Sequence, residues 1–364
     1  MIQNTNTVYA NNKMSIIARG KKYEKQVDSI RVEVEDIPII VDESNGTGLN
    51  FNADILRRLK NNDPSFDFLW ISHWVEEDNT FNPTGEDLVW LGYFIGKNSH
   101  LKHVTIFTLL SENGGGDQYI EAFCDGFNCN HSIEDISFYE CDLLGGALVR
   151  MLSPFFTQSS SLKEISFATG GDGMCVVGRK AANHLALAMR ERVDKSSLET
   201  IDLDGVDLQD ESLVEIAAAL VTYPQLKTLS IGYNEVGRGG SAGCLALRNL
   251  LQKSKTLRSL NLSGTDIDDE ALESLIPAIV SNPTMRTLDL SSIYYFLMRS
   301  LIPLLESSNL TELKMERRQN VDDEDARIFA IALAGNHTMK AFSFDSEQLV
   351  KGWDSFSRLL CNQL

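Results

Sequence analysis

Long apolar runs are absent from this 364-residue sequence: no stretch reaches the roughly eighteen consecutive apolar residues that a helix needs to cross a bilayer. The start of the chain is polar and lacks the apolar core of a secretory signal. Cysteine is scarce as well, because the six present are spread along the chain, as in proteins with reduced thiols rather than disulfides. These absences predict a soluble protein of the cytoplasm, with the nucleus as the alternative compartment, and no membrane association.

Positive charge is also in short supply. The chain has 33 lysines and arginines against 51 aspartates and glutamates, which gives a formal net charge of −18. A protein that binds nucleic acid needs a positive surface to replace the counterions of the phosphates, so we expect no nucleic-acid partner. An anionic membrane surface is disfavoured for the same reason. The acidic balance is compatible with a basic protein partner, and it also serves solubility alone.

Motifs that carry enzyme chemistry are missing or incomplete. Gly173 and Gly178 have the spacing of a phosphate-binding loop, but Lys180 is displaced by one position and no hydroxyl residue follows it. Cys124 and Cys129 lack the second ligand pair of a zinc site, and we expect them to be buried thiols. No Ser/His/Asp or Cys/His arrangement follows from the spacing. The sequence therefore predicts no enzyme, no cofactor and no metal.

A repeated phrase organises the rest of the chain. It consists of an apolar residue, two variable residues, a second apolar residue, one variable residue and a third apolar residue. Ten copies occur in order at spacings of 25 to 36 residues, which indicates a repeat architecture. The copies are FDFLWI from Phe66, LKHVTI from Leu101, IEDISF from Ile133, LKEISF from Leu162, LETIDL from Leu198, LKTLSI from Leu226, LRSLNL from Leu257, MRTLDL from Met285, LTELKM from Leu310 and MKAFSF from Met339. An upstream segment, VDSIRV from Val27, fits the same frame with a longer insertion.

The segment after each phrase has the period of a helix. Leu213, Ile216 and Leu220, for example, lie at positions i, i+3 and i+7, which places them on one helix face. Acidic residues open such segments, as in residues 209–212 and 268–270, where they complement the positive end of a helix. Each unit is therefore predicted to be a short strand, a loop and a helix. Such alternation requires parallel strands joined by right-handed crossovers.

The pattern inside the phrase distinguishes two architectures. A doubly wound sheet is covered on both faces, so its strands read as near-continuous apolar runs. Here only alternate strand residues are apolar, which predicts a sheet with helices on one face and an open second face. Parallel strands backed by bulkier helices bend into a horseshoe. We therefore expect an α/β right-handed solenoid with a concave parallel sheet and convex helices. Residues 27–364 would form it as ten to eleven units, with residues 1–26 as an N-terminal tail or cap.

These units resemble the leucine-rich repeats of the ribonuclease-inhibitor-like subfamily, which occur in ribonuclease inhibitor, the Ran GTPase-activating protein and NOD-like receptors. The family phrase continues to an Asn or Cys three residues after the last strand position, and then to another apolar residue. Cys141 with Leu143 and Asn234 with Val236 match it, whereas the units that begin LKEISF and LTELKM depart from it. The resemblance covers residues 27–364 and implies the repeat solenoid and a protein-binding role.

Strand residues that lie between the buried positions point into the open face, where a solenoid of this kind binds its partners. Phe68, Trp70, Phe107 and Tyr139 are aromatic residues at such positions on three successive predicted strands. Exposed aromatic residues commonly anchor protein interfaces, so these four predict one binding patch. The alternative is that the N-terminal segment folds over them and caps the solenoid.

Acidic residues dominate the remaining positions of this face. Glu316 and Asp345 are among them, and His103 and Lys314 are the basic residues. Six further acidic residues are candidates for partner binding: Asp135, Glu164, Asp202, Asp204, Asp289 and Glu312. This bias of sign predicts a basic protein partner whose association is steered by charge.

The function expected from these features is that of a non-catalytic scaffold or adaptor that binds a protein on its concave face. The alternative implied by the resemblance is a small-GTPase activator similar to the Ran GTPase-activating protein. That activity would require an arginine on a loop, and Arg238 and Arg179 are the loop candidates.

Overall fold

The computed structural model describes residues 51–72, 79–82, 85–107, 117–139, 145–168, 178–293, 297–318 and 323–346. Contacts divide the chain into two compact units, one of residues 1–104 and 109–133 and one of residues 105–108 and 134–364. The predicted N-terminal tail or cap and the repeat phrase at Val27 lie outside the described residues. The division into ten to eleven units from residue 27 onward therefore stays a prediction.

The first unit alternates short strands with helices. Its elements are α2 (Phe51–Lys60), β1 (Phe68–Ile71), β2 (Thr80–Phe81), α3 (Gly85–Lys97), the start of β3 (His103–Phe107) and α4 (Asp117–Phe127). The strand order is β2-β1-β3, and β1 pairs with β2 in parallel, with Trp70 opposite Thr80. The phrases at Phe66 and Leu101 thus form strands as predicted. Strand β2 was not predicted, because two residues are too few to show a period.

Helices α3 and α4 of the first unit touch backbone to backbone. A Cβ atom on Gly92 of α3 would lie 2.6 Å from the Phe123 Cα of α4, and one on Gly126 of α4 would lie 2.7 Å from the Tyr93 nitrogen of α3. Real Cβ atoms are essentially never that close to another heavy atom. The two glycines therefore set the spacing of this helix pair.

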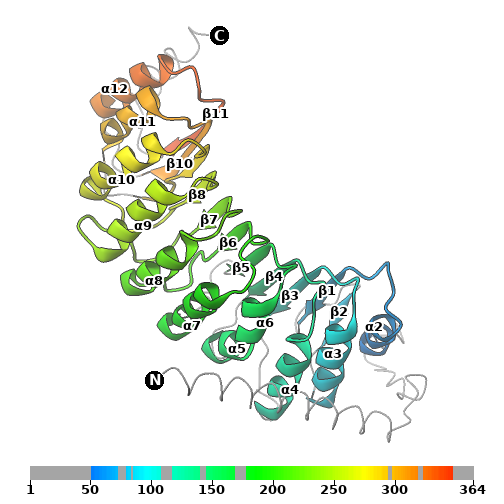
Figure 1. Ribbon diagram of the computed structural model, residues 1–364. Helices are drawn as coiled ribbons and strands as arrows, with labels where there is room; N and C mark the ends of the chain where they lie inside the picture. Colours follow the sequence, from blue (N-terminus) through cyan, green and yellow to red (C-terminus); the bar gives the residue numbers. More distant parts are fainter. Residues whose placement is uncertain are drawn as a thin grey trace, which may run out of the picture. The chain divides into compact units, whose positions relative to one another are not determined.

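The second unit repeats the strand–helix pattern through the rest of the described chain (Figure 1). The order of its strands is β3 to β11 in sequence, and every described pair is parallel. Its elements are the end of β3, β4 (Asp135–Tyr139), α5 (Gly145–Met151), α6 (Ser153–Gln158), β5 (Glu164–Ala168), α7 (Gly178–Glu191), β6 (Thr200–Asp202), α8 (Asp210–Leu220), β7 (Thr228–Ser230), α9 (Ala242–Lys253), β8 (Ser259–Asn261), α10 (Asp269–Ser281), β9 (Thr287–Asp289), η2 (Met298–Leu301), α11 (Ile302–Ser307), β10 (Glu312–Arg318), α12 (Asp323–Ala334) and β11 (Ala341–Ser346).

Burial along the strands follows the alternation that the phrase predicts. Strands β3 and β4 show buried residues only at every second position, and β6, β8 and β9 bury their middle residue. In the second unit, helices α7 to α10 run along one side of strands β5 to β8 (Figure 1). An open, all-parallel sheet that alternates with helices confirms the predicted α/β repeat solenoid. The predicted horseshoe curvature stays a prediction.

The core of the second unit changes character along the repeats. Phe138 on β4 stacks on Phe167 on β5, with ring centroids 4.7 Å apart, and Phe156 of α6 meets Phe138 edge-on. In the repeats of β6 to β9, leucines and an isoleucine fill the equivalent positions, namely Leu203, Ile231, Leu262 and Leu290. Both kinds of side chain are almost completely buried, so packing between strands and helices stabilises the repeats of β4 to β9.

Asparagines stabilise the turns that lead from helix to strand. Asn98, Asn130, Asn282 and Asn336 each accept hydrogen bonds on their side-chain oxygen from the backbone N–H groups two and three residues further on. Their amide nitrogens donate to carbonyl oxygens of the preceding repeat. One side chain therefore closes the turn and joins two repeats, which satisfies buried backbone groups.

In the turn after α7 there is no such asparagine, and the side chain of Arg192 joins this turn to the preceding repeat instead. Its guanidinium is buried and donates to the carbonyl oxygens of Phe156 at 2.6 Å, Asp194 at 2.6 Å and Leu162 at 3.3 Å, and to Ser197 Oγ at 2.9 Å. Removal from water lowers the pKa of Arg192. The side chain thus joins the end of α6 to the turn before β6 without an acidic partner among these contacts.

Candidate protein-binding face

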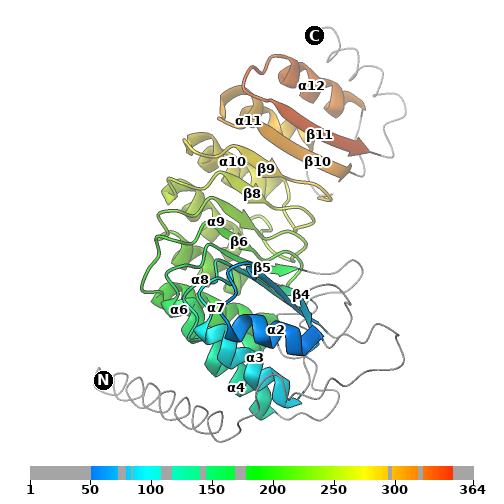
Figure 2. The same cartoon turned by 90° about the vertical axis from the view of Figure 1, so that its right-hand side faces the viewer.

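The register of the strands arranges the outward side chains of the second unit in rows. We call the first two rows the open face. The first row is Asp135, Glu164, Thr200, Thr228, Ser259, Thr287, Glu312 and Ala341. The second row is Ser137, Ser166, Asp202, Ser230, Asn261, Asp289, Lys314 and Ser343. Polar residues fill both rows with the exception of Ala341. The residues between the rows are buried in the core on β4 to β10, and Phe342 on β11 is partly buried. Strands β10 and β11 with their helices appear side by side in Figure 2.

The four aromatic candidates form two pairs. In the first unit, the rings of Phe68 and Trp70 meet edge to face with centroids 5.5 Å apart. In the second unit, Phe107 and Tyr139 stack with centroids 4.9 Å apart and an angle of 18° between the rings. All four side chains are partly exposed. The pairs belong to different units, so the prediction that they form one patch stays a prediction, and the N-terminal cover lies outside the described residues.

The acidic candidate Asp204 lies just beyond β6 and is fully engaged by neighbouring repeats. Its carboxylate accepts hydrogen bonds from Ser230 Oγ at 2.5 Å, the Gly232 N–H at 2.6 Å and Asn261 Nδ2 at 2.8 Å. Gly232 makes this approach possible, because a Cβ atom there would lie 2.7 Å from Ser263 Oγ and 3.1 Å from Asp204 Oδ1. Burial raises the pKa of Asp204, although the three donors act against it. This carboxylate therefore ties three repeats together.

Asp202 has far fewer donors than Asp204. Its carboxylate accepts the backbone N–H of Asp204 at 3.1 Å and a long hydrogen bond from Ser166 Oγ at 3.5 Å. Burial, followed by the nearby negative charge of Asp204, raises the pKa of Asp202 to about 6. The second row therefore contains, near its middle, a carboxylate whose negative charge is poorly compensated.

The other acidic candidates lie toward the two ends of the open face. Asp135 and Glu164 face each other across β4 and β5 in the first row. Toward the opposite end, the carboxylate of Asp289 accepts a hydrogen bond from the Ser291 N–H at 2.9 Å. Glu312 forms an ion pair with Lys314, with 3.5 Å between Glu312 Oε1 and Lys314 Nζ. All six acidic candidates therefore lie on or next to the open face, but the structure distributes them over five repeats rather than in one cluster.

Several further expectations concern catalysis and metal binding. Cys124 is buried, as expected, but Cys129 is exposed, so the expectation of a buried thiol is wrong there. The reason is that Cys129 follows the end of α4 and is not part of its buried stripe. In the described parts of the chain, no group of three or more His, Cys, Asp and Glu residues could hold a metal ion. Arg238 is exposed on its loop, and the side chain of Arg179 lies outside the described residues.

Two features of the site were not predicted from the sequence. Gly232 and Asn261 fall on the predicted open face, but nothing in the sequence indicated that they bind Asp204. Asn234, by contrast, behaves as the family phrase implies. Its side chain is buried, accepts the N–H groups of Val206 and Leu208, and donates to carbonyl oxygens that include that of Ile231.

No helix among the described residues is long and apolar enough to span a bilayer.

Comparisons with known proteins support the repeat. A family model described as a leucine-rich repeat matches residues 253–275, which contain β8 and the start of α10. No curated protein matches the chain. The solved structures that match the chain include leiomodin-1 actin-binding site 2, with 16% identity, a TM-score of 0.31, and coverage of 49% of this chain and 86% of that one.

Two further structures are similar at the same level. The tropomodulin C-terminal domain of Caenorhabditis elegans has 12% identity and a TM-score of 0.32, with 50% of this chain and 92% of that chain covered. The complex of Rad7 and Elc1 in yeast has 11% identity and a TM-score of 0.36, with 96% and 95% covered. Residues 253–275 are thus similar to a leucine-rich repeat, and parallel strands and helices alternate through the other described residues as well.

Proposed function

We propose that this protein is a non-catalytic scaffold or adaptor that holds a protein partner against the open face. The observation that carries the proposal is the composition of that face. Strands β4 to β11 present two rows of mainly short polar side chains, and the helices lie on the other side of the sheet. A broad, polar surface built on a packed repeat core suits recognition of another protein.

The charge of the face supports a basic partner. Asp135, Glu164, Asp202, Asp289 and Glu312 lie in the two rows, and Lys314 is the one lysine or arginine in them. Opposite charge accelerates encounter and selects among partners. Asp202 adds a second reason, because a partner cation would neutralise a carboxylate that the protein itself compensates poorly.

The stacked pair of Phe107 and Tyr139 supplies an anchor at one end of the face. Partly exposed aromatic rings contribute large contact areas at little cost in side-chain entropy. A partner that covers this pair and reaches Asp135 at the opposite end of β4 would gain both an apolar contact and a charge contact.

The experiment is affinity purification followed by mass spectrometry with four baits. They are the wild type, a Phe107→Ala/Tyr139→Ala double variant, an Asp135→Asn/Asp202→Asn double variant and the control Leu245→Ala. Leu245 is exposed on α9, on the helix side of the sheet. We expect one basic prey to be lost with both double variants and kept with Leu245→Ala, and its binding to weaken with rising salt. An unchanged prey list for both double variants would refute the proposal.

A further inference from the structure

One turn position has the same backbone conformation in four successive repeats of the second unit. Three residues after the end of strands β6 to β9, the chain adopts a positive φ angle. The residues and angles are Gly205 at +64°, Tyr233 at +54°, Gly264 at +64° and Ser292 at +57°. Glycine adopts this conformation without strain, whereas a bulky side chain does so at a cost. Tyr233 is therefore the residue that suits this turn least.

Burial does not compensate for the strain at Tyr233. Its side chain is 53% exposed. One side of the ring lies on Gly264, where an added Cβ atom would come within 2.6 Å of Tyr233 Cδ1. The backbone N–H donates to the Ser263 carbonyl at 2.6 Å, which a glycine at this position would do equally well. A strained backbone that holds an exposed aromatic ring is a common feature of binding sites.

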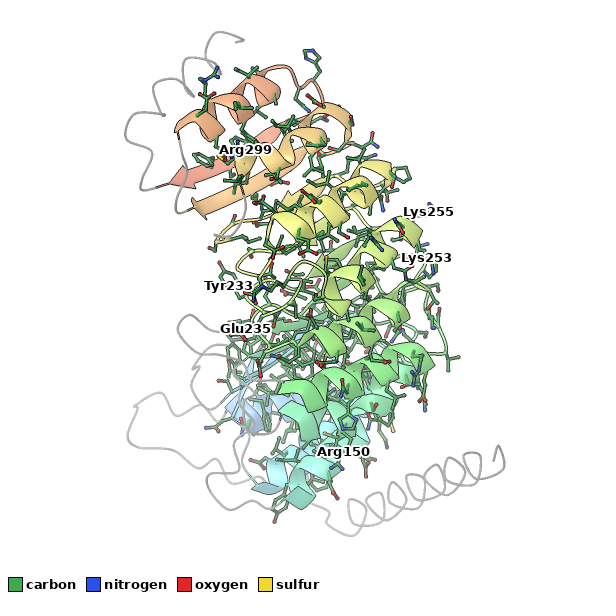
Figure 3. The ribbon with its side chains drawn as sticks, turned by 90° about the vertical axis from the view of Figure 1, so that its left-hand side faces the viewer. Arg150, Tyr233, Glu235, Lys253, Lys255 and Arg299 are labelled. Atoms are coloured by element: carbon green, nitrogen blue, oxygen red, sulfur yellow. The ribbon has the colours of Figure 1, made fainter. Side chains whose placement is uncertain are left out.

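The surroundings of Tyr233 are acidic. Asp207, Glu235 and Asp266 each lie two residues after the positive-φ position in three consecutive repeats. Backbone hydrogen bonds from Gly205 to Gly232 and from Tyr233 to Ser263 keep these turns in register. Figure 3 shows Tyr233 and Glu235 at one edge of the molecule and Lys253 and Lys255 at the opposite edge.

The loop that follows Tyr233 is held firmly by its neighbours. The Gly237 N–H donates to Asp210 Oδ1 at 3.2 Å, and the Gly239 N–H donates to Asp268 Oδ1 at 3.1 Å. Arg238 is the basic residue of this loop and is exposed. No cation of the described residues lies over the ring of Tyr233, in contrast to the rings of Phe66, Tyr93 and Tyr223.

We propose that Tyr233 is an anchor residue for a basic segment of the protein partner. An arginine or lysine of that segment would place its cation over the free side of the ring, within reach of Glu235 and Asp266. This inference rests on the proposed function, because it extends the binding surface from the open face to the adjacent strand-to-helix turns. The ring supplies a cation–π contact and the carboxylates supply charge, a combination that favours a basic partner over a neutral or acidic one.

The test uses two fluorescently labelled nonapeptides of equal length as probes, one with three arginines and one with three glutamates, each separated by glycine and serine. Fluorescence anisotropy at about 50 mM salt measures their affinity, because charges are weakly screened there. We expect the arginine peptide to bind the wild type more tightly than the glutamate peptide does. Tyr233→Gly is expected to weaken the affinity for the arginine peptide by about two- to fivefold, which is the size of a partly exposed cation–π contact.

A second readout separates an anchor from a structural residue. Because the substitution relieves strain, the unfolding temperature of Tyr233→Gly is expected to equal or exceed that of the wild type. Tyr233→Asn repeats the test with a residue that tolerates positive φ but has a less flexible backbone than glycine. Leu245→Ala, which also removes an exposed apolar side chain, is the control and should leave peptide affinity unchanged.

The inference is overturned if both Tyr233 variants bind the arginine peptide as tightly as the wild type, or if both are less stable than the wild type. Its failure can be distinguished from that of the proposed function. For this purpose the two Tyr233 variants are added as baits to the affinity purification. If the open-face variants lose the basic prey and the Tyr233 variants keep it, the proposed function stands and the role of Tyr233 is refuted. If neither group of variants changes the prey list, the proposed function itself fails.

Discussion

Replacement of Asp202 by asparagine should make the protein more stable at neutral pH. The pKa of Asp202 is about 6 in the folded protein against an ordinary value of 3.8. The folded state therefore holds the proton more tightly than the unfolded state does. As pH rises through this window, the unfolded chain loses the proton first, so folding stability decreases from about pH 4 to about pH 6 and stays low above it. The ionised carboxylate is thus a cost at neutral pH.

The size of this effect follows from the shift. A difference of about two pKa units corresponds to at most about 3 kcal/mol, and partial solvent access of the side chain places the effect within about 1–3 kcal/mol. Asp202→Asn keeps the shape of the residue and still offers an oxygen to the Asp204 N–H. We therefore expect the free energy of unfolding to rise by about 1–3 kcal/mol near pH 7.5 and by only about a third of that near pH 4.5.

Urea unfolding followed by far-UV circular dichroism at both pH values measures this difference. Asp289→Asn is the control, because Asp289 also lies in the second row and accepts the Ser291 N–H at 2.9 Å, a hydrogen bond that asparagine retains. We expect no stabilisation from the control. A gain for Asp202→Asn that is the same at both pH values, or a loss near pH 7.5, would refute the reasoning.

Other predictions concern close packing and buried hydrogen bonds, and each is measured by chemical unfolding. Gly232→Ala should destabilise the protein by about 1–3 kcal/mol, because the new Cβ atom would lie 2.7 Å from Ser263 Oγ. Gly126→Ala should cost about 3 kcal/mol, since the Cβ atom would meet the backbone of α3. Gly335→Ala is the control for both, because its nearest neighbour would be 3.6 Å away. Arg192→Ala should cost about 2–4 kcal/mol, because it leaves buried carbonyl groups without donors, and a cost below about 1 kcal/mol would contradict this role.

The repeat architecture could be predicted from the sequence because the apolar positions of each phrase correspond to the buried positions of a strand. Leu257, Leu260 and Leu262 occupy the three apolar positions of one phrase, and all three are fully buried. Ser259 and Asn261, the polar residues between them, lie on the open face, so the phrase also identifies which side of the sheet is open. Strand β2 could not be found in this way, because its two residues, Thr80 and Phe81, are both buried and show no alternation.

The hydrogen-bond partners of the acidic site residues, and hence how well their charges are compensated, could not be predicted from the sequence. Asp202 and Asp204 are identical residues two positions apart, and the pattern treats them alike. In the structure Asp204 receives three donors from the next two repeats, whereas Asp202 receives one backbone N–H and one long hydrogen bond. That difference depends on which side chains the neighbouring strands bring opposite each residue, and above all on Gly232. The strain at Tyr233 depends in the same way on the turn of the adjacent repeat.

The poor compensation of Asp202 leads to a prediction about partner binding itself. A partner cation beside this carboxylate would favour the ionised form and lower its pKa. Near pH 6 the carboxyl is about half protonated in the free protein, so binding should release about half a proton per complex. Near pH 8 the carboxyl is already ionised and no proton from it should be released. Affinity for a basic partner should consequently increase from pH 5 to pH 7.5.

Isothermal titration calorimetry measures the released proton. The partner identified by affinity purification is titrated near pH 6 into the wild type and into Asp202→Asn, each in two buffers with different ionisation enthalpies. The buffer dependence of the heat gives the number of protons released, and the difference between the two proteins isolates the contribution of Asp202 from that of histidines that titrate in the same range. Equal proton release by both proteins would show that the partner cation does not reach Asp202, and would move the contact to another part of the open face.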